Sequence, residues 1–437
     1  MSEPSSAKSF LRLLEMSGIV DKEDLKPAIQ SINQRRKETG AAITANSLSQ
    51  HLIESGLITN WHAEYLLSGK YKGFFLGKYK LQGHLGTGGM SKVYLAEHKI
   101  SGHLRAIKVL PSKKVADKSY LDRFYLEARA AASLNHPNVV RIYDICQEGN
   151  THYMVMEYVK GKDLAEVIDE QGPLQFENAA RYIMEAAEGL RHAHERELVH
   201  RDIKPANLLL TEKSSVKILD LGLALVNQDD SQSLTVLYNE KVMGTADYLS
   251  PEQAVNSHNV DHRADIYSLG CTLYYLLAAH PPFPDGTLAQ RIAKHQTEEP
   301  QNLAEIRAEC PASLIRICNK MMRKQADDRY QSAIEVKAAL RKFIASGEYS
   351  GSIIIKESAR YNPAAIVDAG DAKPVADPGG LQIDVGGSGK RNVDGKSGKL
   401  NVRRRKKPVP KWILPFVIVL MFILMIVVLV VALQNLQ

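Results

Sequence analysis

The sequence predicts an α+β fold preceded by a helical segment, on the basis of three observations. Apolar residues recur at helical spacing through residues 9–69, alternate with polar residues from Lys78 onward, and return to helical spacing after Gly161. Alternation with a period of two is typical of strands that bury one face, and the close succession of short runs favours an antiparallel sheet. We therefore expect an N-terminal helical module and linker at 1–77, followed at 78–345 by a domain with a small sheet portion and a large helical one.

The expected elements of the second domain follow from these runs. Strands are expected at 79–81, 93–95, 106–109, 139–145 and 152–158. A helix at 118–134 is expected to interrupt the sheet. Helices of the larger portion are expected at 176–194, 265–278, 311–323 and 332–343, where apolar residues recur every three or four positions.

An internal repeat organises the N-terminal module. The segment Leu14–Asp21 recurs as Leu52–Thr59, 38 residues later, and each copy has a glycine, two apolar residues and a helix-capping residue. Glycine ends a helix at little conformational cost and Asp or Thr can begin the next, so each copy predicts a helix–turn–helix unit. The expected core of the two units comprises Leu14, Leu25, Ile29, Leu52, Trp61 and Leu66. Two interpretations are equally supported, a regulatory or partner-binding module and an extension that buttresses the next domain.

Composition indicates a globular chain without a general affinity for nucleic acid. Of the residues, 44% are hydrophobic and 24% are charged, which is ordinary globular usage. Six of the seven net positive charges are supplied by the run 403–411, so the basicity is local and nucleic-acid binding gains no support. The four cysteines form no C-x-x-C pair and are expected to be reduced thiols; they are Cys146, Cys271, Cys310 and Cys318.

The C-terminal part predicts a membrane anchor. Residues 346–411 are rich in Gly, Ser, Asp and Ala and end in the basic run, so a disordered linker is expected. Residues 412–433 carry no charge and are long enough to cross a hydrocarbon core, which needs about 20 helical residues. The basic run before the span predicts that the preceding chain lies in the cytoplasm, with 434–437 as a short extracytoplasmic tail. This topological role is favoured over recognition of anionic lipids, and no signal peptide is expected at the N-terminus.

The stretch from His200 to Asn207 places a carboxylate, an ammonium group and an amide at fixed short spacings. Asp202 can accept a hydroxyl proton, Lys204 can neutralise a transferring phosphoryl group, and Asn207 can ligate a metal ion. The order His-Arg-Asp-x-x-x-x-Asn resembles the catalytic loop of the protein kinases. Further kinase motifs follow in order over about residues 79–344, so the resemblance implies a bilobal protein-kinase fold, with a small antiparallel sheet lobe plus one helix and a large, mainly helical lobe.

The same resemblance implies an ATP site in the small lobe. The family closes a glycine-rich turn over the phosphates, and the matching residues here are Leu85, Gly86, Thr87, Gly88 and Gly89, with Val93 over the base. Ser91 stands where the family usually has its third glycine, and we expect altered nucleotide affinity at most. Lys108 would hold the α- and β-phosphates and would itself be positioned by Glu127.

The base pocket and the metal ligands are assigned in the same way. The implied base contacts are Ala106, Met156 as the gatekeeper, the backbone of Glu157 and Val159, and Leu209. Asp220 follows an apolar run at 216–219 and would bridge Mg²⁺ or Mn²⁺ to the phosphates, with Asn207 on a second ion.

Beyond the metal site, the resemblance implies features of serine/threonine kinases. Thr245 would bond to Asp202 and Lys204, and the polar segment 222–244 would be a phosphorylation switch. Autophosphorylation of Thr235 or Ser233 is our hypothesis for that segment. Two structural roles are implied as well, an ion pair of Glu252 with Arg329 and support of the catalytic loop by Asp265.

These expectations describe a serine/threonine protein kinase that transfers the γ-phosphoryl group of ATP to proteins and phosphorylates itself. We expect the catalytic domain to be cytoplasmic and anchored to the cell membrane by a single C-terminal span. The expected partners are protein substrates, the membrane and a second copy of the chain for trans-autophosphorylation, without nucleic acid. The alternative is an inactive pseudokinase scaffold that binds nucleotide and partners at the membrane.

Overall fold

The structure is a computed structural model that describes residues 6–88, 91–110, 118–220, 246–255 and 260–348. The chain divides into two compact units, Met1–Glu357 and Ser358–Gln437. All described residues belong to the first unit. Within these ranges no helix is long and apolar enough to cross a membrane. The predicted linker and span at 346–433 lie outside the described residues beyond position 348, so the anchor stays a prediction.

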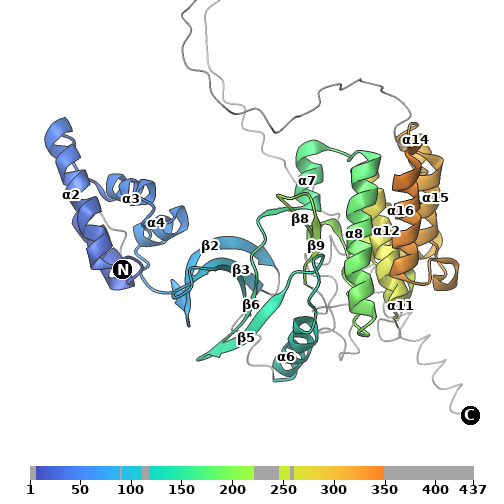
Figure 1. The fold of residues 1–437 in the computed structure, drawn as a ribbon, viewed down its shortest axis with the longest axis horizontal. Coiled ribbons are helices and arrows are strands. Elements are labelled where there is room, and N and C mark those ends of the chain that lie inside the picture. The colour runs from blue at the N-terminus through green and yellow to red at the C-terminus, as the bar shows by residue number, and fades with distance from the viewer. Residues whose placement is uncertain (1–5, 89–90, 111–117, 221–245, 256–259, 349–437) are drawn as a thin grey trace, which may run out of the picture. The chain divides into compact units, whose positions relative to one another are not determined.

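Four helices form the N-terminal module (Figure 1). They are α1 (Ala7–Ser17), α2 (Lys22–Thr39), α3 (Ala45–Glu54) and α4 (Asn60–Leu67). Gly18 and Gly56 adopt the left-handed conformation after α1 and α3, with φ of 67° and 70°. The two helix–turn–helix units predicted from the repeat are therefore present.

The caps and the core of the module differ in part from the prediction. Thr59 caps α4 with its side chain, whereas Asp21 stands at the start of α2 without a side-chain capping bond. Of the expected core, Leu14, Leu25, Leu52 and Leu66 are buried, while Ile29 and Trp61 are only partly buried against it. Trp61 also packs against the neighbouring sheet.

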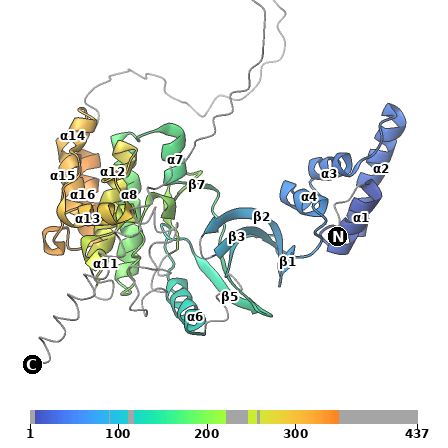
Figure 2. The same cartoon turned by 180° about the vertical axis from the view of Figure 1, so that it is seen from behind.

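A six-stranded antiparallel sheet and helix α6 (Lys118–Ala132) make up the small lobe. The strands are β1 (Phe75–Leu76), β2 (Tyr79–Gly88), β3 (Ser91–His98), β4 (Leu104–Val109), β5 (Ile142–Glu148) and β6 (Thr151–Glu157). Their order in the sheet is β1-β2-β3-β4-β6-β5, and Figure 2 shows the strong curvature of β2 and β3. The strand expected from Val139 begins only at Ile142, because Val139 instead bridges to Ile218 of the other lobe.

The large lobe is mainly helical, as expected, but it also contains a small second sheet that the sequence analysis did not predict as a unit. Its strands are β7 (Gly161–Asp163), β8 (Leu208–Thr211) and β9 (Val216–Ile218), in the order β7-β8-β9. The helices are α7 (Leu164–Gln171), α8 (Phe176–His194), α11 (Pro251–Val255), α12 (Arg263–Ala278), α13 (Leu288–Thr297), α14 (Leu303–Ile306), α15 (Ala312–Met321) and α16 (Ala333–Ser346). Short 3-10 helices lie at Pro205–Asn207, Ala246–Tyr248 and Ala326–Asp328.

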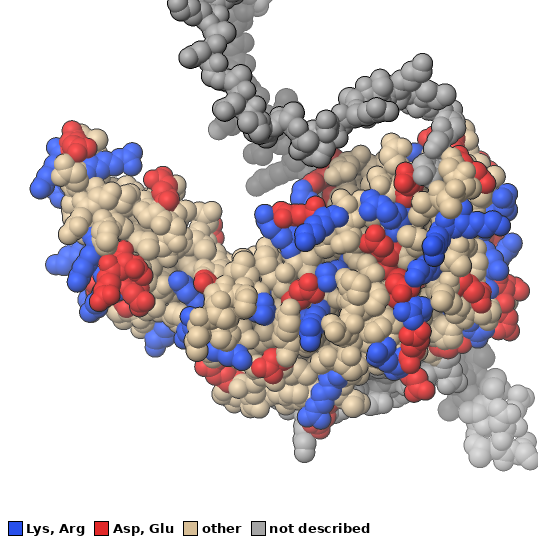
Figure 3. Space-filling model, in the orientation of Figure 1, with Lys and Arg blue, Asp and Glu red and all other residues tan. Residues whose placement is uncertain are grey.

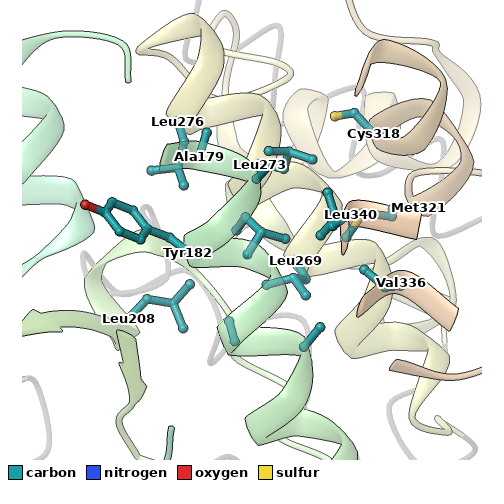
Figure 4. Close-up of a cluster of buried hydrophobic side chains, with 14 of the residues drawn as sticks. Ala179, Tyr182, Leu208, Leu269, Leu273, Leu276, Cys318, Met321, Val336 and Leu340 are labelled. Atoms are coloured by element: carbon teal, nitrogen blue, oxygen red, sulfur yellow. The ribbon is translucent and has the colours of Figure 1, made fainter. Parts of the chain in front are cut away.

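The core of the large lobe lies where α8, α12, α15 and α16 pack together (Figure 4). Helix α8 presents small residues, including Ala179 and Gly189, which let its backbone approach its neighbours closely. A side chain at Gly189 would start 2.8 Å from the carbonyl oxygen of Asn138 and from the side chain of Ile218. Each leucine buried in this core contributes about 1.5–3 kcal/mol relative to an exposed one. The packing fixes the end of α8 and the start of α12, which flank the catalytic loop.

Acidic and basic side chains are interspersed over the face of the molecule seen in Figure 3. The basic run at 403–411 lies outside the described residues.

Among the described residues, the four cysteines are free thiols, three of them buried, and only Cys146 is partly exposed. Burial raises the pKa of Cys271 to about 12, which makes this thiol unreactive at neutral pH.

Candidate active site

The side chain of Asp265, in the first turn of α12, holds the catalytic loop by hydrogen bonds. This side chain is fully buried and accepts hydrogen bonds from the backbone N–H of His200 at 2.8 Å and of Arg201 at 2.7 Å. A third bond, 2.8 Å long, joins it to Nε2 of His194 at the end of α8. Burial raises the pKa of the Asp265 carboxyl, but the bond to His194 and the nearby histidines outweigh it, so the pKa lies below its usual value. The predicted support of the loop is present in the structure.

The backbone of Arg201 is strained in support of this arrangement. Its φ of 66° lies in the left-handed region, which a non-glycine residue adopts at a cost on the order of 1–2 kcal/mol. The side-chain amide of Gln253, in α11, donates to the Arg201 carbonyl at 2.9 Å. The sequence analysis named neither Gln253 nor His194, because their partners lie 52 and 71 residues away and no local pattern marks them.

Three predicted catalytic residues meet in the loop. The Nζ of Lys204 lies 2.8 and 3.0 Å from the two carboxylate oxygens of Asp202. The Asn207 amide nitrogen donates to the carboxylate of Asp202 at 3.0 Å and to its carbonyl at 2.6 Å. The Asp202 side chain is 30% exposed, so an incoming hydroxyl can reach a carboxylate that is already oriented.

The His200 ring forms two hydrogen bonds with the backbone next to this cluster. Its Nδ1 accepts from the N–H of Asp202 at 3.2 Å, and its Nε2 lies 2.7 Å from the carbonyl oxygen of Leu219. These partners correspond to a neutral imidazole with the proton on Nε2. The ring therefore ties the catalytic loop to the segment that ends in Asp220.

Asp220 faces Lys108 across the two lobes. Its Oδ1 lies 2.6 Å from the Lys108 Nζ, on strand β4. The φ of Asp220 is 54°, a second left-handed residue at the site. Desolvation by the surrounding protein raises the pKa of the Asp220 carboxyl. The positive charge and the hydrogen bond of Lys108, with smaller effects of neighbouring groups, together lower it by a larger amount, so the pKa lies below its usual value. Asp220 is thus a carboxylate ready to bind a cation.

The donor set fits a divalent cation held jointly with phosphate. The N–H of Leu219 donates to the Asn207 carbonyl at 2.9 Å, which places Asp220 next to Asn207. The Asn207 amide nitrogen faces Asp202, so its Oδ1 is the atom that remains for an ion. In the described part of the chain, no group of three or more His, Cys, Asp or Glu side chains could hold a metal by itself. An ion here would take Oδ1 of Asn207, an oxygen of Asp220 and further oxygens from a phosphate, as Mg²⁺ commonly does.

The glycine-rich hairpin joins β2 to β3. Gly88 pairs with Ser91 across it, and Gly89 and Met90 lie outside the described residues. A Cβ built on Gly86 would meet no atom within 4 Å, so this part of the hairpin has open space beside it. The other predicted contacts on β2 are Leu85, whose exposed fraction is 46%, and Thr87, whose Oγ1 lies 3.0 Å from Nε2 of His84.

Four of the predicted base-pocket residues lie in one apolar cluster. Its members among them are Val93, Ala106, Met156 and Val159. The N–H of Glu157 donates to the Arg141 carbonyl at 2.8 Å and is therefore not available to a base. Its side chain pairs with Lys217 at 3.0 Å and links the two lobes. Leu209 lies half-buried on β8 and does not belong to this cluster.

The remaining predicted residues are described only in part. Glu127 lies on α6, but its side chain lies outside the described residues, as do Thr245 and the segment 222–244 with Ser233 and Thr235. The expected pair of Glu252 with Arg329 is present, with both guanidinium nitrogens at 2.7 Å from the carboxylate. The Arg329 side chain is fully buried and also donates to three backbone carbonyls, so this pair fixes α11 beneath the site.

Comparison with known proteins decides the family. Residues 79–340, more than half of the chain, match the model of the protein kinase domain. The chain belongs to the protein kinase family. This kinase is 38% identical over 267 residues to the serine/threonine-protein kinase PknB of Mycolicibacterium smegmatis, a match that covers 60% of this chain and 42% of PknB.

A second curated relative and a solved structure are also similar to this chain. The serine/threonine-protein kinase PrkC of Bacillus subtilis is 38% identical over 266 residues, or 61% of this kinase and 40% of PrkC. The crystal structure of the PknI kinase domain of Mycobacterium tuberculosis has 26% identity and a TM-score of 0.48, and covers 61% of this chain and 97% of that domain. This kinase spans less than half the length of PknB and of PrkC, and helices α1–α4 precede the matched region.

Proposed function

We propose that this kinase transfers the γ-phosphoryl group of ATP to serine or threonine hydroxyls of proteins. The proposal rests on the cluster of Asp202, Lys204 and Asn207. A buried carboxylate holds the loop that carries this cluster, and a backbone hydrogen bond joins Asn207 to Leu219, the residue before Asp220. Asp202, Lys204 and Asn207 hydrogen-bond to one another, and Lys108 pairs with Asp220, an arrangement that supports phosphoryl transfer. The named relatives are serine/threonine kinases, which supports the choice of acceptor.

Each residue has a role in the proposed reaction. Asp202 orients the acceptor hydroxyl and takes its proton as the bond to phosphorus forms. Lys204 lies beside this carboxylate and offsets negative charge on the phosphoryl group, while Lys108 holds the non-transferred phosphates. A bound Mg²⁺ or Mn²⁺ would supply positive charge at the phosphate oxygens, and Asn207 and Asp220 are the residues that would hold it.

The first test compares the wild-type chain with Asp202→Asn in a radiolabelled-ATP assay. Because the general base contributes about 10²–10⁴-fold to such reactions, we expect phosphate incorporation to fall at least about 100-fold. Nucleotide binding should persist, since Asp202 is not among the residues assigned to the base or the phosphates. Asp169→Asn, an exposed aspartate on α7, serves as the control and should retain full activity.

The same assay separates the enzyme from the pseudokinase scaffold. A scaffold that only binds nucleotide would show equal, background incorporation in the wild type and in Asp202→Asn, and that result would refute the proposed activity. Mapping the phosphorylated residues in the wild type also tests autophosphorylation, for which we propose Thr235 or Ser233, with a second copy of the chain as the acceptor. An active preparation without phosphate in 222–244 would refute that part.

We also propose that the kinase is anchored to the cell membrane by residues 412–433, with its catalytic domain in the cytoplasm. The support is the uncharged apolar run and the basic residues just before it. Full-length chain should sediment with membranes and resist extraction by high salt, while a chain ending at residue 345 should stay in the supernatant. Full-length chain in the supernatant would contradict the anchor.

A further inference from the structure

Helix α4 of the N-terminal module binds the strand that carries the glycine-rich turn. The Oγ1 of Thr59 donates to the carbonyl of Gln82 at 2.7 Å. The Nε2 of His62 lies 2.6 Å from the carbonyl oxygen of Leu81. Thr59 and His62 are the two members of the capping box of α4, so the helix start and the strand share one hydrogen-bonded network.

These two carbonyls lie at a β-bulge. The register of β2 against β3 shifts between Leu81 and Gly83, which leaves Gln82 as an extra residue opposite β3. A bulge interrupts the hydrogen bonds of a ladder and requires other partners for the polar groups that it frees. The module supplies those partners from outside the sheet. Strand β2 then continues through a second register shift, between His84 and Gly86, into the glycine-rich hairpin.

The His62 ring is a neutral hydrogen-bond donor. Its side chain is fully buried, and its Nδ1 accepts from the N–H of Thr59 at 3.2 Å. The proton of the neutral ring is therefore on Nε2, directed at the Leu81 carbonyl. Burial lowers the pKa of His62 to about 4, with a smaller lowering by Lys80, so the ring stays neutral at physiological pH.

The surrounding contacts fall on the same hairpin. The N–H of Leu81 donates to the carbonyl of Phe74 at 2.8 Å. The Trp61 ring packs against that of Tyr94 on β3, with centroids 6.0 Å apart. Burial lowers the pKa of Lys80, and Glu97 and, to a smaller extent, Asp21 and Asp24 of the first helix–turn–helix unit offset part of this lowering. The module thus holds β2 by hydrogen bonds and ring packing.

We propose that Thr59 and His62 are positioning residues for nucleotide binding, because they fix the bulged segment of β2 and thereby place the hairpin that covers the phosphates. The inference rests on the proposed ATP site. It gives the N-terminal module a role in the reaction although the module lies outside the kinase domain. Loss of these bonds should weaken nucleotide binding, while binding of the protein substrate to the large lobe should change little.

The test uses the full-length chain and two variants that remove one donor each, Thr59→Val and His62→Leu. Their matched partners Thr59→Ser and His62→Gln keep a donor at the same place. Thr44→Val is the control for module stability, because Thr44 caps α3 through an equivalent capping box and, among the described residues, its side chain bonds only to Ser47. Affinity is measured with N-methylanthraniloyl-ADP and Mg²⁺, alongside KM for ATP, KM for a peptide substrate, and kcat.

We expect Thr59→Val and His62→Leu each to raise the nucleotide Kd and the ATP KM about fivefold, which corresponds to the net loss of one hydrogen bond. The peptide KM should stay within about twofold of the wild-type value. For Thr59→Ser, His62→Gln and Thr44→Val, the nucleotide Kd and the ATP KM should also stay within about twofold of the wild-type values. Unchanged nucleotide affinity in both donor-deleted variants would overturn the proposal. Equal weakening by Thr44→Val would also overturn it, since the effect would then reflect only module stability.

Two further outcomes are informative. If His62→Leu does not fold, the comparison of Thr59→Val with Thr44→Val decides by itself, because both remove an N-cap from the same module. If the wild-type chain binds no nucleotide at all, the proposed function fails and this inference fails with it. A wild type that binds nucleotide, together with variants that bind equally well, refutes only the positioning role.

Discussion

The two halves of the active site are held in different ways. The catalytic loop is fixed by Asp265, a buried charge within the kinase domain that binds two backbone N–H groups and His194. The glycine-rich hairpin is fixed by neutral bonds from Thr59 and His62, which precede the region that matches the kinase domain. The chemical half is therefore self-contained, whereas the nucleotide cover depends on an added helical module.

The difference should appear in the size of mutational effects. Hydrogen bonds to an ionised group are roughly twice as strong as neutral ones, and a buried donor left without its charged acceptor is costly. Loss of the bonds between Asp265 and the catalytic loop should therefore damage both folding and activity. Loss of the bonds from Thr59 and His62 to β2 should change nucleotide affinity and leave the catalytic loop in place.

The largest effect is expected for Asp265→Asn. An amide has only one acceptor oxygen, so its NH₂ group would face one of three buried donors, and we expect a loss of about 3 kcal/mol or more in the free energy of unfolding. The kcat should fall at least about tenfold even at temperatures where the variant is folded, because a misplacement near 1 Å in the catalytic loop is enough to slow the reaction. Thermal unfolding and phosphate incorporation measure the two effects.

Asp261→Asn is the matched control for this variant. Asp261 lies just before α12 and pairs with Arg263, but its side chain is 48% exposed, so its removal should cost less than about 1 kcal/mol. Equal losses for the two variants would show that the buried carboxylate has no special role in holding the loop.

A smaller effect, restricted to acid pH, is expected at His62. Its pKa is about 4 in the folded chain, against the ordinary value of 6.5, mainly because the ring is buried. Between these values the unfolded chain binds a proton that the folded chain does not, so stability falls as the pH is lowered from 6.5 to 4 and is unaffected above 6.5. The free energy of unfolding falls by about 3 kcal/mol at most over this range.

His62→Gln cannot take up this proton, so it should lose less stability than the wild type over that range and resemble it at pH 7. Unfolding is followed by the fluorescence of Trp61, which lies next to His62, in a Trp412→Phe background because the chain has two tryptophans. Parallel stability curves for the two proteins between pH 4 and 6.5 would show that the ring is not held neutral. The argument for its donor role would then fail.

Much of the site could be predicted from the sequence because its residues are clustered in short motifs. The spacing of Asp202, Lys204 and Asn207 is set within one loop, and the pair of Glu252 with Arg329 followed from two motifs. Helix α8 has the predicted bounds, and α6 ends within two residues of its predicted end, since apolar periodicity is a local property. The small second sheet was missed as a unit, because its strands have only three or four residues and β7 is separated in sequence from β8 and β9.

The sequence by itself determined the family motifs, the repeat and the helix–turn–helix units of the module, because each depends on residues close together in the chain. It also marked Thr59 as a helix cap. Only the tertiary structure decided that Thr59 and His62 reach the bulge at Gln82, while Asp21 and Asp24, at the corresponding positions of the first copy, lie close enough to Lys80 to offset part of the lowering of its pKa. The two copies share a local pattern but meet different surfaces, and which surfaces meet depends on the packing of the whole unit.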